Sequence, residues 1–154
     1  MNAYKIQRMT FDVDFMLTKE DCEKIEPDIL SLGYSIFNRT AAFVQYKSER
    51  AGLRDLDLLI GDKNTVDRLL EQGREVSIAG EKFVVPSAVH LIEMKLHAMS
   101  GNKKREIKDL PDVIQLLAVN NIDQESGDIK KLFVKYSAME LYERIVKALK
   151  PDKG

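Results

Sequence analysis

The sequence contains no tryptophan, a single cysteine and no long apolar segment. With Cys22 alone, neither an intramolecular disulfide nor a cysteine-rich zinc site can form, and we expect a cytoplasmic protein. No apolar run approaches the roughly 18 residues that a membrane-spanning helix needs, and the N-terminus has no signal-peptide core. The formal net charge of −1 gives the 154-residue chain no strong overall attraction to nucleic acid or membranes.

The sequence does contain a clear hydrophobic pattern, and its period changes near Pro86 from that of strands and short helices to that of longer helices. The patterns predict strands over residues 9–17, 34–37, 41–47, 53–60, 75–79 and 82–85, with helices over 18–32 and 65–72. Four helices are predicted afterwards, over residues 87–99, 109–119, 122–136 and 138–149. We therefore predict an α+β fold in one domain, residues 1–154, with a small mixed sheet in 1–86 and a helical half, 87–150, packed on it.

Prolines decide two of these predicted boundaries. Pro27 interrupts the first predicted helix, so we expect it to split that helix or to shift its start. Asp109 with Pro111 is typical of an N-cap and first turn, so we expect the second of the four later helices to begin there.

Two aspartates lie one residue apart in an otherwise apolar strand. Because side chains at positions i and i+2 of a strand share a face, Asp12 and Asp14 project to the same side. Two neighbouring like charges are relieved either by solvent or by a bound cation. Carboxylates without histidine or cysteine suit Mg²⁺ or Mn²⁺, whereas the alternative interpretation is the solvated face of a sheet.

A second acidic strand favours the cation. Asp57 stands between Leu56 and Leu58, which is an apolar setting for a charged side chain. If its strand lies beside the first, Asp57 completes a three-carboxylate cluster with Asp12 and Asp14. Such clusters hold divalent metals and direct an in-line phosphoryl or nucleotidyl displacement.

Lys95 is the third unusual residue, because its helical neighbours Leu91, Ile92 and Met99 are apolar. A lysine on this stripe must extend its amine to solvent or meet an anion. A phosphate ligand, a carboxylate of the sheet and an ion pair with Asp109 all remain open.

Four segments resemble the polymerase-beta-like nucleotidyltransferase superfamily, in its small prokaryotic, abortive-infection toxin-like form. Residues 8–15 (RMTFDVDF) are similar to its Arg-x-Thr-x-Asp-x-Asp strand, and residues 54–59 (RDLDLL) to its third-carboxylate strand. Residues 85–98 (VPSAVHLIEMKLHA) and 104–113 (KREIKDLPDV) resemble the segments that follow its sheet. The resemblance runs from about residue 2 to about residue 150.

The resemblance implies an enzyme that transfers a nucleoside monophosphate from an NTP to an RNA, protein or small-molecule acceptor, with Mg²⁺ or Mn²⁺ as cofactor. It implies metal binding by Asp12, Asp14 and Asp57, with Asp57 activating the acceptor hydroxyl. It implies that Lys95 reaches the nucleotide phosphates. The remaining substrate-binding residues that we expect are Arg8, Thr10, Arg105, Asp109 and Asp112. Because the family includes toxins, an antitoxin-like neutralising protein is an expected partner.

One family feature does not occur in this sequence. The family places a helix ending in Gly-Gly or Gly-Ser before the Asp-x-Asp strand, where backbone amides hold the triphosphate. Seven residues precede Arg8 and none is glycine. Either translation starts at an internal methionine, or this member has lost its phosphate-binding loop. The second case favours an alternative function, a catalytically reduced module that binds a partner or forms a homodimer. A metal-dependent nuclease is a third interpretation.

Overall fold

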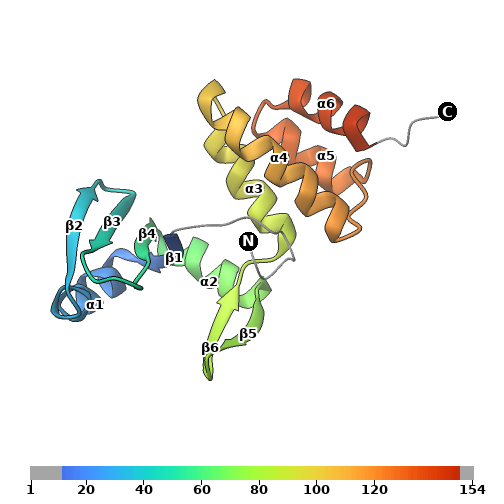
Figure 1. Cartoon of the computed structure of the whole chain (residues 1–154). Helices are drawn as coiled ribbons and strands as arrows, with labels where there is room; N and C mark the ends of the chain where they lie inside the picture. The colour runs from blue at the N-terminus through green and yellow to red at the C-terminus, as the bar shows by residue number, and fades with distance from the viewer. Residues whose placement is uncertain (1–11, 150–154) are drawn as a thin grey trace. The chain divides into compact units, whose positions relative to one another are not determined.

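The computed structural model describes residues 12–149, which form two compact units of α+β structure (Figure 1). The sheet unit comprises residues 12–72, and the helical unit comprises residues 73–149. The mixed sheet and the later helices confirm the predicted fold class. The boundary lies between α2 (Lys63–Gln72) and β5 (Arg74–Ile78), so the hairpin of residues 74–85 falls in the helical unit. None of the described helices combines the length and the apolar content needed to cross a membrane.

The sheet unit contains four strands and two helices. Its elements are β1 (Asp12–Thr18), α1 (Lys19–Ser31), β2 (Tyr34–Arg39), β3 (Phe43–Ser48), β4 (Asp55–Gly61) and α2 (Lys63–Gln72). The strand order is β1-β4-β3-β2, with β1 parallel to β4 and the other neighbours antiparallel. The core lies on the sheet face that α1 covers, and it is formed by the buried side chains of Cys22, Ile29, Val44, Tyr46 and Leu58.

Helix α1 begins as its sequence predicts and continues through its proline. The Thr18 hydroxyl caps the helix by accepting a hydrogen bond from the Asp21 backbone N–H at 3.1 Å. Pro27 lies inside the helix and is exposed, so water can satisfy the carbonyl that the missing N–H would have bonded. The expectation that Pro27 splits or shifts the helix was therefore wrong. The helix ends before Gly33, whose φ of +90° favours glycine.

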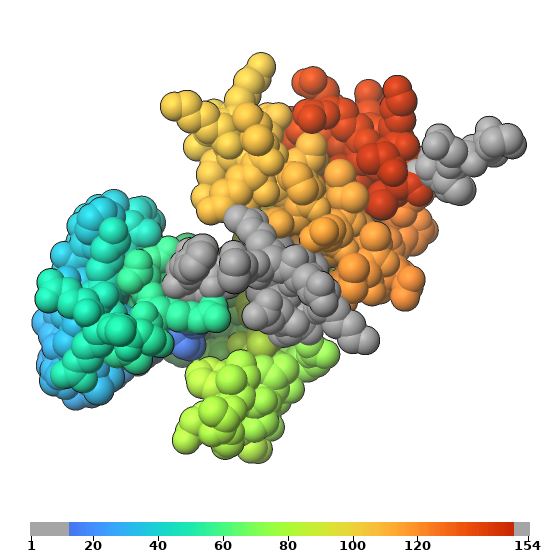
Figure 2. All heavy atoms as spheres, in the orientation of Figure 1, coloured from blue at the N-terminus to red at the C-terminus, as the bar shows by residue number. Residues whose placement is uncertain are grey.

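The helical unit begins with a hairpin and continues as four helices. Its elements are β5 (Arg74–Ile78), β6 (Glu81–Val85), α3 (Ala88–Met99), α4 (Lys103–Val119), α5 (Gly127–Lys135) and α6 (Met139–Leu149). Ala79 and Gly80 both have positive φ, as the tight hairpin turn requires. In the space-filling view, α3 to α6 form one continuous body of atoms from yellow to red (Figure 2).

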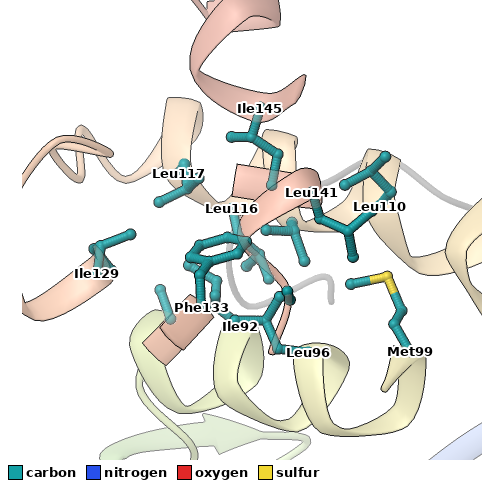
Figure 3. Packing of buried hydrophobic residues seen from close by; sticks show 13 residues of the cluster. Ile92, Leu96, Met99, Leu110, Leu116, Leu117, Ile129, Phe133, Leu141 and Ile145 are labelled. Carbon is teal, nitrogen blue, oxygen red and sulfur yellow. The ribbon is translucent and has the colours of Figure 1, made fainter. Parts of the chain in front are cut away.

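The core of the helical unit is assembled from all four helices. Side chains of α3, α4, α5 and α6 point toward one another around Phe133, which has no exposed surface (Figure 3). Ile92 and Leu96 of α3, Leu116 of α4 and Ile145 of α6 are also completely buried. Burial of each such side chain stabilises the fold by about 1.5–3 kcal/mol, and this explains why four amphipathic helices stay together.

Helix α4 corrects one sequence prediction, because it starts at Lys103 and not near Asp109. Asn102 is the N-cap, and its side chain accepts a hydrogen bond from the Arg105 N–H at 3.4 Å. Pro111 lies within the helix on its exposed side. Its cost inside a helix, about 3 kcal/mol, is opposed by the burial of apolar residues along the same helix. Asp109 is consequently a buried helical residue rather than a cap.

Candidate functional site

Two aspartates of the sheet unit lie side by side on neighbouring strands. In the parallel pairing of β1 with β4, Asp14 is opposite Asp57 and Asp12 is opposite Asp55. Neighbouring strands are about 4.8 Å apart, and paired residues project from the same face of a sheet. The strand adjacency on which the predicted carboxylate cluster depends is therefore present.

The alternation of β1 and β4 explains why these charges avoid the core. Phe15 and Leu17 of β1 and Leu56 and Leu58 of β4 pack on the face that α1 covers. The carboxylates occupy the intervening positions, on the opposite face. Asp14 is exposed and Asp57 is partly buried, so water can reach this face at Asp14. We call this surface of β1, β4 and β3 the acidic face.

A glutamine of β3 extends the row. Gln45 is opposite Asp57 in the antiparallel pairing of β3 with β4. Its side-chain amide Nε2 donates to both carboxylate oxygens of Asp57, at 3.1 Å to Oδ1 and 3.2 Å to Oδ2. Sequence reasoning missed this residue. The available signal was a single amide between Val44 and Tyr46, in a strand that is otherwise mostly apolar.

The acidic face has the donor chemistry that a magnesium ion requires. Asp14 and Asp57 supply hard oxygen ligands, and Mg²⁺ is usually held by one or two carboxylates together with water and substrate phosphates. Among the side chains that the structure describes, no group of three acidic, histidine or cysteine residues could hold a metal ion. The predicted third ligand is Asp12, and its side chain lies outside the described residues, as do Arg8 and Thr10.

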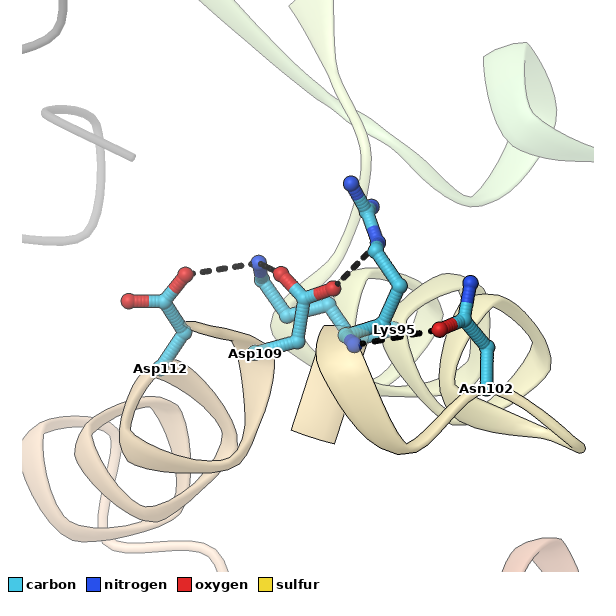
Figure 4. Close-up of polar contacts among 5 residues, drawn as sticks. Lys95, Asn102, Asp109 and Asp112 are labelled. Carbon is cyan, nitrogen blue, oxygen red and sulfur yellow. Dashed lines mark hydrogen bonds and ion pairs between the residues drawn. The ribbon is translucent and has the colours of Figure 1, made fainter. Parts of the chain in front are cut away.

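The helical unit contains a separate cluster around Lys95. The Nζ atom of Lys95 donates to Asp109 Oδ1 at 2.9 Å and to Asp112 Oδ2 at 2.7 Å (Figure 4). The Lys95 side chain is 19% exposed, whereas those of the two aspartates are 2% and 6% exposed. Because α4 already includes Asp109 and Asp112, their spacing of three residues places both on the helix face toward α3.

Arg105 brings a second positive charge to this cluster. Its Nε atom is 2.9 Å from Asp109 Oδ2, four residues along the same helix. This distance is short enough for an ion pair, although the Nε–H of Arg105 is not aligned for a hydrogen bond to the buried Oδ2 of Asp109. The two cations balance the two carboxylates, which is the usual requirement for burying charge. The structure thus shows the ion pair between Lys95 and Asp109 that the sequence left open, together with a second ion pair between Lys95 and Asp112.

A third polar cluster fastens α1 to the sheet. Tyr46 is fully buried, and its hydroxyl donates to Glu26 Oε2 at 2.7 Å; Glu26 also pairs with Arg39. The hydrogen bond from Tyr46 lowers the pKa of Glu26, and burial raises the pKa of the Tyr46 hydroxyl. Burial likewise raises the pKa of the Cys22 thiol, which keeps it protonated and unreactive. These groups face the core, and we assign them a structural role.

Comparison with known proteins finds distant structural similarity. No family model matches the sequence, and no curated protein matches it either. The chain is similar to the crystal structure of an antigenic nucleotidyltransferase-like protein from Paracoccidioides brasiliensis, at 14% sequence identity and a TM-score of 0.49. The similarity covers 89% of this chain and 75% of that chain.

Proposed function

We propose that this protein is a metal-dependent nucleotidyltransferase, which moves a nucleoside monophosphate from an NTP to a hydroxyl acceptor. The observation that carries the proposal is the register of β1 and β4, which places Asp14 beside Asp57 on one face of the sheet. The motif resemblance of residues 8–15 and 54–59 supplies the reaction class. An RNA, a protein or a small molecule would serve as the acceptor.

In this proposal the carboxylates have different tasks. Asp14, with Asp12, would hold the nucleotide-bound Mg²⁺ or Mn²⁺, which neutralises triphosphate charge and lowers the pKa of a bound hydroxyl. Asp57 would be the third ligand of the metal, and it would orient the acceptor hydroxyl and take its proton. The acceptor oxygen then forms a bond to the α-phosphorus while the bond to pyrophosphate breaks. Partial burial of Asp57 strengthens its electrostatic interaction with these groups.

Lys95 and Arg105, both in the helical unit, are the residues that we propose for phosphate binding. The resemblance motivates this role, and the contacts of Lys95 determine what phosphate binding would require. Lys95 is held by two carboxylates, so Asp109 and Asp112 would fix the direction of its amine. A phosphate would have to share that amine with them, and the more exposed Arg105 is the easier of the two cations to reach.

Nucleotide-dependent stability is the direct test. The full chain would be melted with Mn²⁺ alone and with Mn²⁺ plus each of ATP, CTP, GTP and UTP, because a ligand that binds the native state raises its apparent stability. We expect one or more nucleotides to raise the melting temperature, and Asp57→Asn to abolish that rise. Asp67→Asn is the matched control, since Asp67 forms its ion pair with the exposed Lys63 of the same helix.

Transfer is then measured with α-labelled nucleotides and candidate acceptors. Asp14→Asn and Asp57→Asn should each remove transfer while Asp67→Asn retains it. Label transfer that survives in either site variant would contradict the assignment.

A non-catalytic module that binds a partner or forms a homodimer is the second candidate. The charge balance around Lys95 favours it, because two carboxylates already satisfy the cation that would otherwise meet phosphate. If no nucleotide with Mn²⁺ changes the melting temperature, this candidate replaces the first. Sedimentation of the full chain, alone and with an antitoxin-like protein where one is encoded beside it, would then separate dimer formation from partner binding.

A further inference from the structure

Gln45 contacts both oxygens of Asp57 through its side-chain amide. Both distances, 3.1 Å and 3.2 Å, start from the same Nε2 atom, so the amide forms a fork across the carboxylate. The opposite amide orientation would place the Oε1 acceptor against two acceptor oxygens, which would be repulsive. The chemistry therefore fixes the direction of the amide.

The position of Gln45 in the sheet adds to this argument. Asp57 has Gln45 as its register partner on β3 and Asp14 as its register partner on β1. It is therefore flanked by a neutral donor on one side and by an acid on the other. A lysine or arginine at position 45 would also bond the carboxylate, but its positive charge would compete with a divalent cation. A neutral amide holds the carboxylate and leaves its charge available.

We propose that Gln45 is a positioning residue that holds the Asp57 carboxylate in the orientation that binds a divalent cation on the acidic face. This inference rests on the proposed function, since it assumes that Asp57 is a metal ligand. Ligands act best when hydrogen bonds outside the metal sphere fix their direction, and loss of such a partner typically costs 10- to 100-fold in metal affinity.

The test is a titration of the full chain with Mn²⁺, in which electron paramagnetic resonance counts the free ion. Gln45→Met keeps the length and packing of the side chain but removes the donor. We expect it to weaken Mn²⁺ binding about tenfold, near the lower end of the usual effect. Gln72→Met makes the same chemical change at an exposed position at the end of α2, and it should bind Mn²⁺ like the wild type.

A double-mutant cycle separates positioning from a structural role. If Gln45 acts through Asp57, Gln45→Met should have no further effect on Mn²⁺ affinity in an Asp57→Asn chain. Equal Mn²⁺ affinity of the wild type and Gln45→Met, with weaker binding in Asp57→Asn, would overturn this inference alone. A wild-type chain that binds no Mn²⁺ would overturn the proposed function and this inference with it. Melting curves of each variant show whether the fold is retained.

Discussion

Removing the amine of Lys95 should destabilise the helical unit strongly. Asp109 and Asp112 are almost completely buried, and Lys95 bonds both of them at less than 3 Å. Deleting one partner of a buried ion pair typically costs about 3–5 kcal/mol, because the remaining charge stays out of water. Asp109 keeps the nearby Arg105 guanidinium, so we take the lower end of this range for Lys95→Met, about 3 kcal/mol.

The assay is urea unfolding followed by circular dichroism, with thermal melting as a second measurement. A loss of about 3 kcal/mol should lower the melting temperature of a unit of this size by 10 °C or more. Lys130→Met is the control, because Lys130 is exposed on α5, and it should change the unfolding free energy by less than about 0.5 kcal/mol. Combining Lys95→Met with Asp109→Asn and Asp112→Asn should recover part of the loss. A cost below about 1 kcal/mol for Lys95→Met would refute the reasoning that these buried charges depend on one another.

Three further predictions concern stability. The lowered pKa of Glu26 stabilises the fold above the ordinary glutamate pKa, and this contribution is lost as pH falls. The raised pKa of Tyr46 makes stability fall as pH rises above about 10. Urea midpoints measured against pH should show both declines, and Tyr46→Phe should reduce the alkaline one. Gly33→Ala should cost about 1–2 kcal/mol in urea unfolding, because φ is +90° and the new Cβ would lie 2.8 Å from Arg50 Nε. Asn102→Ala should cost about 1 kcal/mol through loss of the α4 cap, and hydrogen exchange should quicken in the first turn of that helix.

Local signals in the sequence were sufficient for most elements of the sheet unit. Alternation in β1 separated Phe15 and Leu17 from the aspartates, and Thr18 and Gly33 marked both ends of α1. These features depend on residues close together in the chain, so periodicity and capping rules describe them well.

The errors and omissions share a different cause. Pro111 was interpreted as the start of a helix, because its intrinsic cost inside one is high, yet packing of the surrounding apolar residues outweighs that cost. Gln45 was missed because its bond to Asp57 depends on the register of two strands, which no local pattern specifies. Asp109 was named as a partner of Lys95 from the sequence, whereas the contact with Asp112 depends on how α3 packs against α4, which no local pattern specifies.

Among the described strands, β1 lies at the edge of its sheet, and this placement has a consequence for how the chain folds. β2, β3 and β4 follow one another in the chain and pair antiparallel in that order. β1 instead pairs with β4, which comes after β2 and β3 in the chain. Closing that long loop is the entropically expensive event in assembling this topology. During synthesis, the carboxylates of Asp14 and Asp57 therefore meet only once the rest of the sheet has been made, so a nascent chain acquires its candidate ion-binding pair late.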